Sequence, residues 1–165
     1  MNMTIRRRKF ALTAHVASSV GWFGAVVCFM ALAIAGATSR DAQTIRAVYI
    51  AMDLIYWYVI VPLGLASLLT GLVSSLGTEW GLFRHYWVLV KLLLTIPLTT
   101  LLLMHTQPVG YMAGEGLQRI LSGADLVGLR IQLAAYAGAA LLVLLVATAL
   151  SVYRPRGMTG YGTRR

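Results

Sequence analysis

The stretch FALTAHVASSVGWFGAVVCFMALAIAGA, from Phe10 to Ala37, decides the fold class, because it runs for 28 residues without Asp, Glu, Lys or Arg. The hydrocarbon core of a bilayer is about 30 Å thick, and a helix needs about 20 apolar residues to cross it. The stretch is continuously apolar rather than alternating, which favours a helix over a barrel strand. We therefore expect a membrane-spanning helix here.

Three further apolar stretches are also long enough to span, and the only charged residues in them are Asp53 and Lys91. Together the four stretches predict an all-α integral membrane protein, a four-transmembrane-helix bundle with up-down-up-down order and short connections. This single domain is expected to cover residues 1–153. The predicted helices cover about residues 10–37, 47–76, 86–104 and 131–152.

The composition excludes several classes of protein. Of the 165 residues, 59% are hydrophobic and 12% are charged, whereas soluble domains have about 45–50% apolar and about 25% charged residues. A disordered chain and a nucleic-acid-binding domain are therefore excluded. The single cysteine, Cys28, excludes a disulfide scaffold.

The distribution of Lys and Arg predicts the orientation. Nine basic residues fall on the side that holds both chain ends, and four fall on the other side. The positive-inside rule then places both termini in the cytoplasm of a bacterium, in a multi-pass plasma-membrane protein that contacts anionic lipid headgroups. The basic tail 154–165 is expected to be disordered. In the second outer loop, Leu117, Ile120, Leu121, Ala124 and Val127 have helical spacing, which predicts a short amphipathic helix on the outer surface.

Three segments carry a family resemblance: RKFALTAHVASSVGW (Arg8–Trp22), SSLGT (Ser74–Thr78) and WGLFRHYWVLVK (Trp80–Lys91). They are similar to a family of bacterial integral membrane proteins, domain of unknown function 2269, and the resemblance covers roughly Arg8 to Tyr111. The chain also distantly resembles copper-resistance D-type membrane proteins. The resemblance implies an integral membrane fold, and it brings no activity with it.

Polar residues inside a membrane are costly, so they are candidate site residues. His15 and His85 are expected at the cytoplasmic side, and they predict bis-histidine ligation of a b-type haem. Lys91 and Arg84 would neutralise its propionates. Trp22 shares a helix face with His15, and a cavity lined by Ser19, Trp22, Leu89 and residues near Gly71 is expected to hold the macrocycle. The alternative is that both histidines lie at the interface and bond to helices or headgroups.

A second set of candidates lies at the outer side. Asp53, His105 and Arg130 form an expected outer polar cluster, which we interpret as a structural ion pair or hydrogen bond. Thiol, thioether and imidazole groups suit Cu(I), although methionines also fill gaps in apolar cores. The candidate soft-metal residues are Cys28, Met30, Met52, Met104, His105 and Met112.

The sequence leaves the function open between classes. It has no nucleophile elbow, phosphate loop, paired carboxylates or His-Glu-x-x-His motif, so an enzyme is not expected. The specific hypothesis is a small haem-binding membrane redox protein. The alternatives are transport of a metal, such as copper, or of a small solute, and a non-catalytic role in a homo- or hetero-oligomeric membrane complex. Pro62 and Pro97 are expected to kink their helices.

Overall fold

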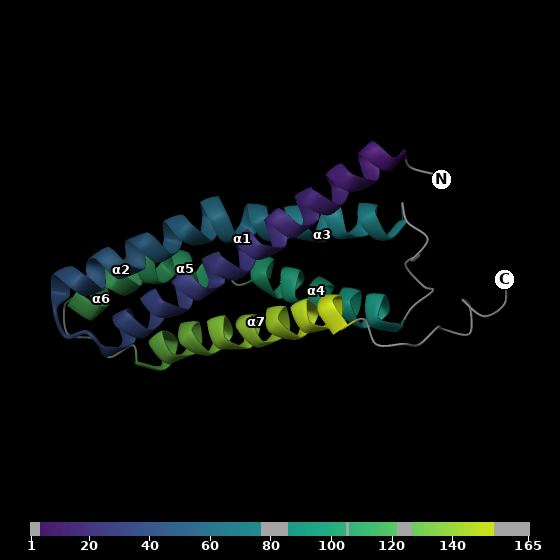
Figure 1. Cartoon of the computed structure of the whole chain (residues 1–165). Coiled ribbons are helices and arrows are strands. Elements are labelled where there is room, and N and C mark those ends of the chain that lie inside the picture. Colours follow the sequence, from purple (N-terminus) through teal and green to yellow (C-terminus); the bar gives the residue numbers. More distant parts are fainter. Residues whose placement is uncertain (1–3, 77–85, 105, 122–126, 154–165) are drawn as a thin grey trace.

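The computed structural model describes residues 4–76, 86–104, 106–121 and 127–153, and within these ranges it contains helices and no strand (Figure 1). This confirms the all-α prediction. The helices are α1 (Ile5–Thr38), α2 (Ala42–Ile55), the π-helical turn η1 (Tyr56–Ile60), α3 (Val61–Leu76), α4 (Tyr86–Met104), α5 (Thr106–Ala113), α6 (Glu115–Leu121) and α7 (Val127–Tyr153).

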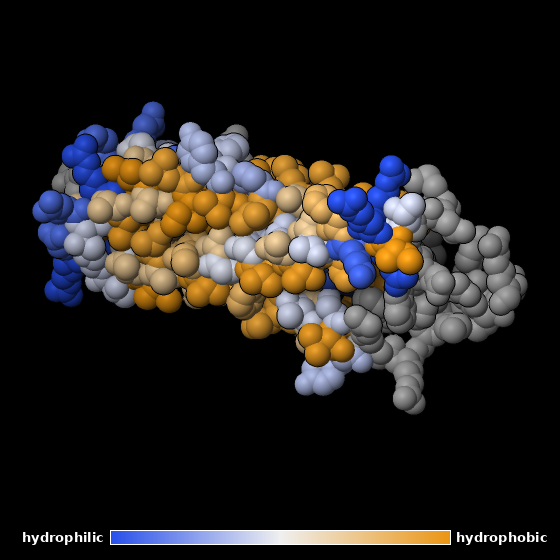
Figure 2. Space-filling view, turned by 45° about the horizontal axis from the view of Figure 1, so that its top comes forward, coloured by the Kyte–Doolittle hydropathy of each residue, from blue (hydrophilic) through white to orange (hydrophobic). Residues whose placement is uncertain are grey.

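Four helical stretches are long and apolar enough to cross a membrane, as predicted. Figure 2 shows apolar side chains around the middle of the molecule and hydrophilic side chains toward its ends, which is the pattern of a multi-pass membrane protein. The first and last helices extend a few residues beyond their predicted bounds. The four stretches are Ile5–Thr38, Ala42–Leu76, Val88–Ala113 and Val127–Tyr153.

Helix α1 lies at the centre of the bundle and contacts α2, α3 and α7, while α4 packs against α7 and α3. The start of α1, the end of α3, the start of α4 and the end of α7 lie together at one end of the bundle, called the terminal end below (Figure 1). The end of α1 and the start of α7 lie together at the opposite end, where Arg130 of α7 bonds to Gly36 of α1.

Close packing between α1 and α3 depends on small residues, as expected for helices in lipid. A Cβ atom added to Gly64 would lie 3.2 Å from the Trp22 ring. Trp22 is 2% exposed and belongs to a core cluster with Phe29, Tyr49 and Met52. The indole therefore fills the space that the glycine leaves between the two helices.

The sequence around Pro62 forms a π-helical turn, where a kink was expected. Pro62 has no N–H, so the carbonyl of Tyr58 cannot receive the normal helical bond. Directly before the proline, the Val61 N–H bonds to the Tyr56 carbonyl, five residues back. The wider turn also directs the Tyr56 hydroxyl to the Leu102 carbonyl of α4, where it donates a hydrogen bond. The backbone change thus ties the second span to the third.

The segment after α4 differs from the predicted single surface helix, because it contains two short helices: α5, which belongs to the third apolar stretch, and α6, which follows it. Val109 and Met112 of α5 and Leu117 of α6 are buried in the main core cluster. Helix α5 packs along α2 (Figure 1), so this segment covers the bundle with its apolar side chains. The predicted helix overlaps α6, but Ala124 and the tail 154–165 lie outside the described residues.

Candidate functional site

A network of polar side chains connects four helices inside the terminal end of the bundle. His15 of α1 stands at its centre, about 15 Å along the helix from Ile5 at 1.5 Å per residue. On α1, Ser18 and Ser19 follow His15 by three and four positions, so they lie on the same helix face as the histidine. On α3, Ser67 and Thr70 are three positions apart and also share a face. The network consists of His15, Ser18, Ser19, Ser67, Thr70, Lys91 and Ser151.

The contacts of His15 fix the position of one ring proton. Nδ1 lies 3.0 Å from the Ser67 carbonyl oxygen, which can only accept a hydrogen bond, and 3.3 Å from the Thr70 Oγ1 atom. The Thr70 hydroxyl donates its own proton to the Ala66 carbonyl, at 2.5 Å, so it also accepts from the ring. Nδ1 must therefore carry a proton, and Nε2 is the nitrogen that can bind or release one.

Lys91 contacts that second nitrogen. Its Nζ atom lies 3.4 Å from His15 Nε2 and donates to the Ser151 Oγ atom at 2.8 Å. Ser151 donates its own proton to the Ala147 carbonyl, and its oxygen accepts from Lys91. No carboxylate among the described residues pairs with Lys91, and Glu79 lies outside them.

This arrangement satisfies hydrogen bonds for two placements of one proton. With a neutral His15, Nε2 accepts from the Lys91 ammonium group. With a charged His15, Nε2 donates to the neutral amine, which still donates to Ser151. A positive charge is retained in both cases, on one nitrogen or on the other.

Packing holds the imidazole in place from the side. A Cβ atom added to Gly71 would lie 3.0 Å from His15 Cε1, so any other residue at this position would require the ring to shift. One turn further into the bundle, the hydroxyls of Ser19 and Ser67 are 2.7 Å apart. These contacts pack α1 against α3 around the imidazole ring, whereas the haem cavity was expected between α1 and α4.

The proposed haem ligands are only partly described. His15 and Lys91, which were expected on the same side of the membrane, lie together in the network. His85 and Arg84 lie outside the described residues. Trp22 packs into the core against Gly64, and its buried Nε1 has no hydrogen-bond partner among the described residues. The bis-histidine geometry therefore stays a prediction.

The expected outer polar cluster has a different set of contacts. Arg130 donates from Nη2 to the Gly36 carbonyl and, at 3.3 Å, to the Ser39 carbonyl, so it caps the end of α1. The Oδ1 atom of Asp53 is buried and has no hydrogen-bond partner among the described residues, and no bond joins it to Arg130. His105 lies outside them.

The candidate soft-metal residues are spread over different surroundings. Cys28 is exposed and Met104 is 73% exposed, whereas Met52 and Met112 are fully buried in the core. Met30 lies near Gly138, since a Cβ atom there would be 3.7 Å from Met30 Cε. The described residues contain no group of three or more His, Cys, Asp or Glu side chains that could hold a metal ion.

Sequence reasoning missed four members of the network: Ser18, Ser67, Thr70 and Ser151. A signal was present, because Ser67 and Thr70 are polar residues three positions apart within an apolar helix. Ser151 carries no such local pattern, and only the packing of α7 against α4 brings it to Lys91.

Comparisons of the chain with protein-family models, with curated proteins and with solved structures found no match. The function is therefore argued from the residues of the chain itself.

Proposed function

We propose that the chain is a protein of the bacterial plasma membrane in which the His15–Lys91 pair binds and releases one proton, as the protonation step of small-solute transport. The observation that carries the proposal is the 3.4 Å approach of Lys91 Nζ to His15 Nε2 within a span-forming bundle. Intramembrane ionisable residues mark ion and proton pathways in many membrane proteins.

The proposal includes the orientation of the spans. They run up-down-up-down with both termini in the cytoplasm, so the terminal end and its network lie in the cytoplasmic half. The basic residues of the chain support this, as does the meeting of the start of α1 with the ends of α3 and α7 in the network. A reporter fused after Arg165 should face the cytoplasm, and one inserted at Gly114 should face outward. Reporters on the same side would contradict the topology.

The network offers a proton more than one acceptor. Lys91 and His15 exchange it along the Nζ–Nε2 contact, while Ser151 and the Ser67 carbonyl keep hydrogen bonds in both states. His15 and Lys91 are both half-buried, so the charge depends in part on these partners for its stabilisation. Loss of either nitrogen would remove the exchange.

The test uses the full chain reconstituted in liposomes that contain a pH-sensitive dye, with a potassium diffusion potential that is negative inside. We expect proton entry above that of empty liposomes, and at least about a tenfold loss in His15→Gln and in Lys91→Met, as for removal of a proton-transfer group. Thr148→Ala is the matched control, since Thr148 lies one turn from Ser151 and bonds only to the Leu144 carbonyl. Equal rates in all variants would contradict the proposal.

A second candidate is b-type haem binding, and one specific observation favours it. Histidines that bind metals usually donate the other ring N–H to a carbonyl or carboxylate, as His15 Nδ1 does to Ser67. Nε2 would then be the nitrogen that holds the iron, and Lys91, whose Nζ lies 3.4 Å from it, would have to move away when haem binds. A Soret band in the purified protein that is lost in both His15→Ala and His85→Ala would support haem. A protein without this band would favour the proton site.

A further inference from the structure

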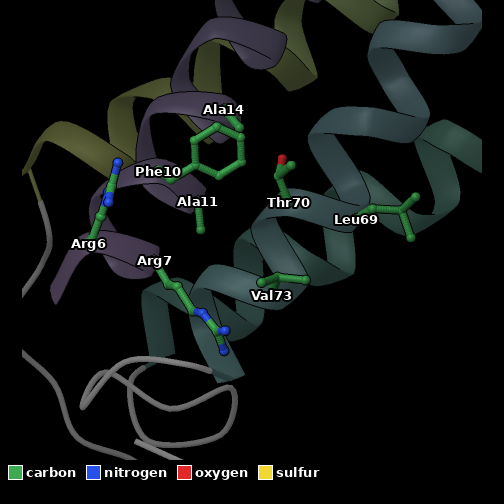
Figure 3. A pocket seen from close by; sticks show the side chains of 8 residues that line it. All are labelled: Arg6, Arg7, Phe10, Ala11, Ala14, Leu69, Thr70 and Val73. Atoms are coloured by element: carbon green, nitrogen blue, oxygen red, sulfur yellow. The ribbon is translucent and has the colours of Figure 1, made fainter. Parts of the chain in front are cut away.

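A groove between α1 and α3 lies beside the internal polar network at the terminal end. Its volume is about 520 Å³, within the range of about 300–1,000 Å³ for small-molecule sites. Arg6, Arg7 and Phe10 line it from α1, and Leu69, Thr70 and Val73 line it from α3 (Figure 3). The groove is not part of the network, although Thr70 contributes to both.

The lining changes from charged to apolar along α1. Arg6 and Arg7 lie in the first turn, and both side chains are exposed. One turn further, Phe10 is 77% exposed, and across the groove Leu69 is 62% exposed. These apolar side chains face outward, where lipid surrounds a spanning helix, so the groove is open to lipid along its length.

The polar atoms of the groove favour an anion. The two guanidinium groups carry donors in the planar arrangement that matches phosphate, and no acidic residue lies among the described lining residues. The Thr70 hydroxyl donates to the Ala66 carbonyl, so it adds no further charge. From Arg6 to Ala14 the wall extends about 12 Å along the helix axis, the direction in which a lipid acyl chain runs.

We propose that this groove binds one anionic phospholipid of the cytoplasmic leaflet. Its phosphate lies at the charged end of the groove, within reach of Arg6 and Arg7, whose side chains diverge from the start of α1 (Figure 3), and one acyl chain follows the apolar wall past Phe10, Leu69 and Val73. A free phosphate ion would leave that wall without a partner. The cation of a zwitterionic headgroup would offset the charge of its own phosphate and weaken its attraction to the two arginines. The inference rests on the proposed orientation in the membrane.

The test titrates the detergent-solubilised full chain with phosphatidylglycerol or phosphatidylcholine, and native mass spectrometry counts the lipids retained on each chain. Arg6→Gln/Arg7→Gln removes both charges from the groove. Arg8→Gln/Lys9→Gln is the matched control, because it removes two charges from neighbouring exposed positions that do not line the groove. Ala14→Phe fills the groove without changing its charge.

We expect one retained phosphatidylglycerol per chain. Each basic residue at an anionic surface contributes roughly fivefold in affinity, so Arg6→Gln/Arg7→Gln should weaken binding about 30-fold, while the control stays within about threefold. Ala14→Phe should also lose the lipid. Because Arg6 and Arg7 are exposed, their variants test the site even where Ala14→Phe fails to fold.

Three results would overturn the proposal: equal weakening by the two double variants, equal retention of phosphatidylcholine, or displacement of the lipid by inorganic phosphate. The proton measurement uses variants of His15 and Lys91, and the reporters test the orientation directly. A failure of lipid binding is therefore distinguishable from a failure of the proposed function.

Discussion

The Nζ atom of Lys91 in α4 lies 2.8 Å from the Oγ atom of Ser151 in α7, and this bond joins the third span to the last. Lys91 has no carboxylate partner among the described residues, so Ser151 and His15 are its polar contacts there. A lysine held in this way stabilises the bundle only while both contacts are kept.

Ser151→Ala should therefore destabilise the protein by about 1–2 kcal/mol, because the half-buried Lys91 loses a hydrogen-bond acceptor. The measurement is unfolding by a denaturing detergent, followed by circular dichroism. Thr148→Ala, which removes a hydroxyl bonded only within its own helix, should change stability by less than about 0.5 kcal/mol. Equal effects of the two substitutions would mean that Ser151 does not support Lys91.

Gly71→Ala should displace the His15 ring, because the added Cβ would lie 3.0 Å from Cε1. Overpacking of this kind costs about 1–3 kcal/mol. Gly24→Ala is the control, since a Cβ there meets no atom within 4 Å. Unfolding midpoints of the two variants test this, and a Gly71→Ala protein as stable as the Gly24→Ala protein would contradict the tight fit.

Arg130→Gln should loosen the opposite end of the bundle. The arginine donates to the Gly36 and Ser39 carbonyls, and hydrogen bonds to a charged donor contribute about 1.5–3 kcal/mol. Arg46→Gln removes the same charge from an exposed side chain of α2 and should change stability little. Hydrogen exchange of the last turn of α1 should rise in Arg130→Gln alone, and unchanged exchange there would rule out the capping role.

Stability at acid pH should depend on Asp41, which caps α2. The Thr44 hydroxyl and the Thr44 N–H donate to this carboxylate and hold its pKa below the usual value of 3.8. A lowered pKa in the folded state stabilises the fold above the pKa of the unfolded chain, and this contribution is lost as the pH falls through the folded pKa. Unfolding midpoints should therefore drop at pH values below 3.8. Asp41→Asn keeps a hydrogen-bond acceptor but cannot titrate. The unfolding midpoint of this variant should therefore fall less at acid pH than that of the unchanged protein. Identical pH profiles would show that Asp41 is not the group responsible.

The helices were predictable because a span in lipid requires a long apolar run of residues. The predicted helix 86–104, for example, coincides with α4. The π-helical turn before Pro62 was not predicted, because a proline indicates that a helical bond is lost but not which bond replaces it. The burial of Val109 and Met112 was not predicted either, since it depends on contacts between segments distant in sequence. The sequence predicted His15 and Lys91 on the same side of the membrane. It did not predict their contact, which depends on how α1 and α4 pack in the bundle. Asp53 and Arg130 were expected together, yet the carbonyl groups at the end of α1 bind the arginine.

The central claim is that His15 carries a proton on Nδ1 and uses Nε2 to share a proton with Lys91. Nitrogen NMR of the full chain in lipid, with ¹⁵N-labelled histidine, tests it most directly, and the signals of His15 are assigned by their loss in His15→Gln. The account predicts a protonated Nδ1 at all pH values at which the protein is folded, and a shift of Nε2 when Lys91 is replaced by Met. An unprotonated Nδ1, or an Nε2 signal that Lys91→Met leaves unchanged, would contradict it.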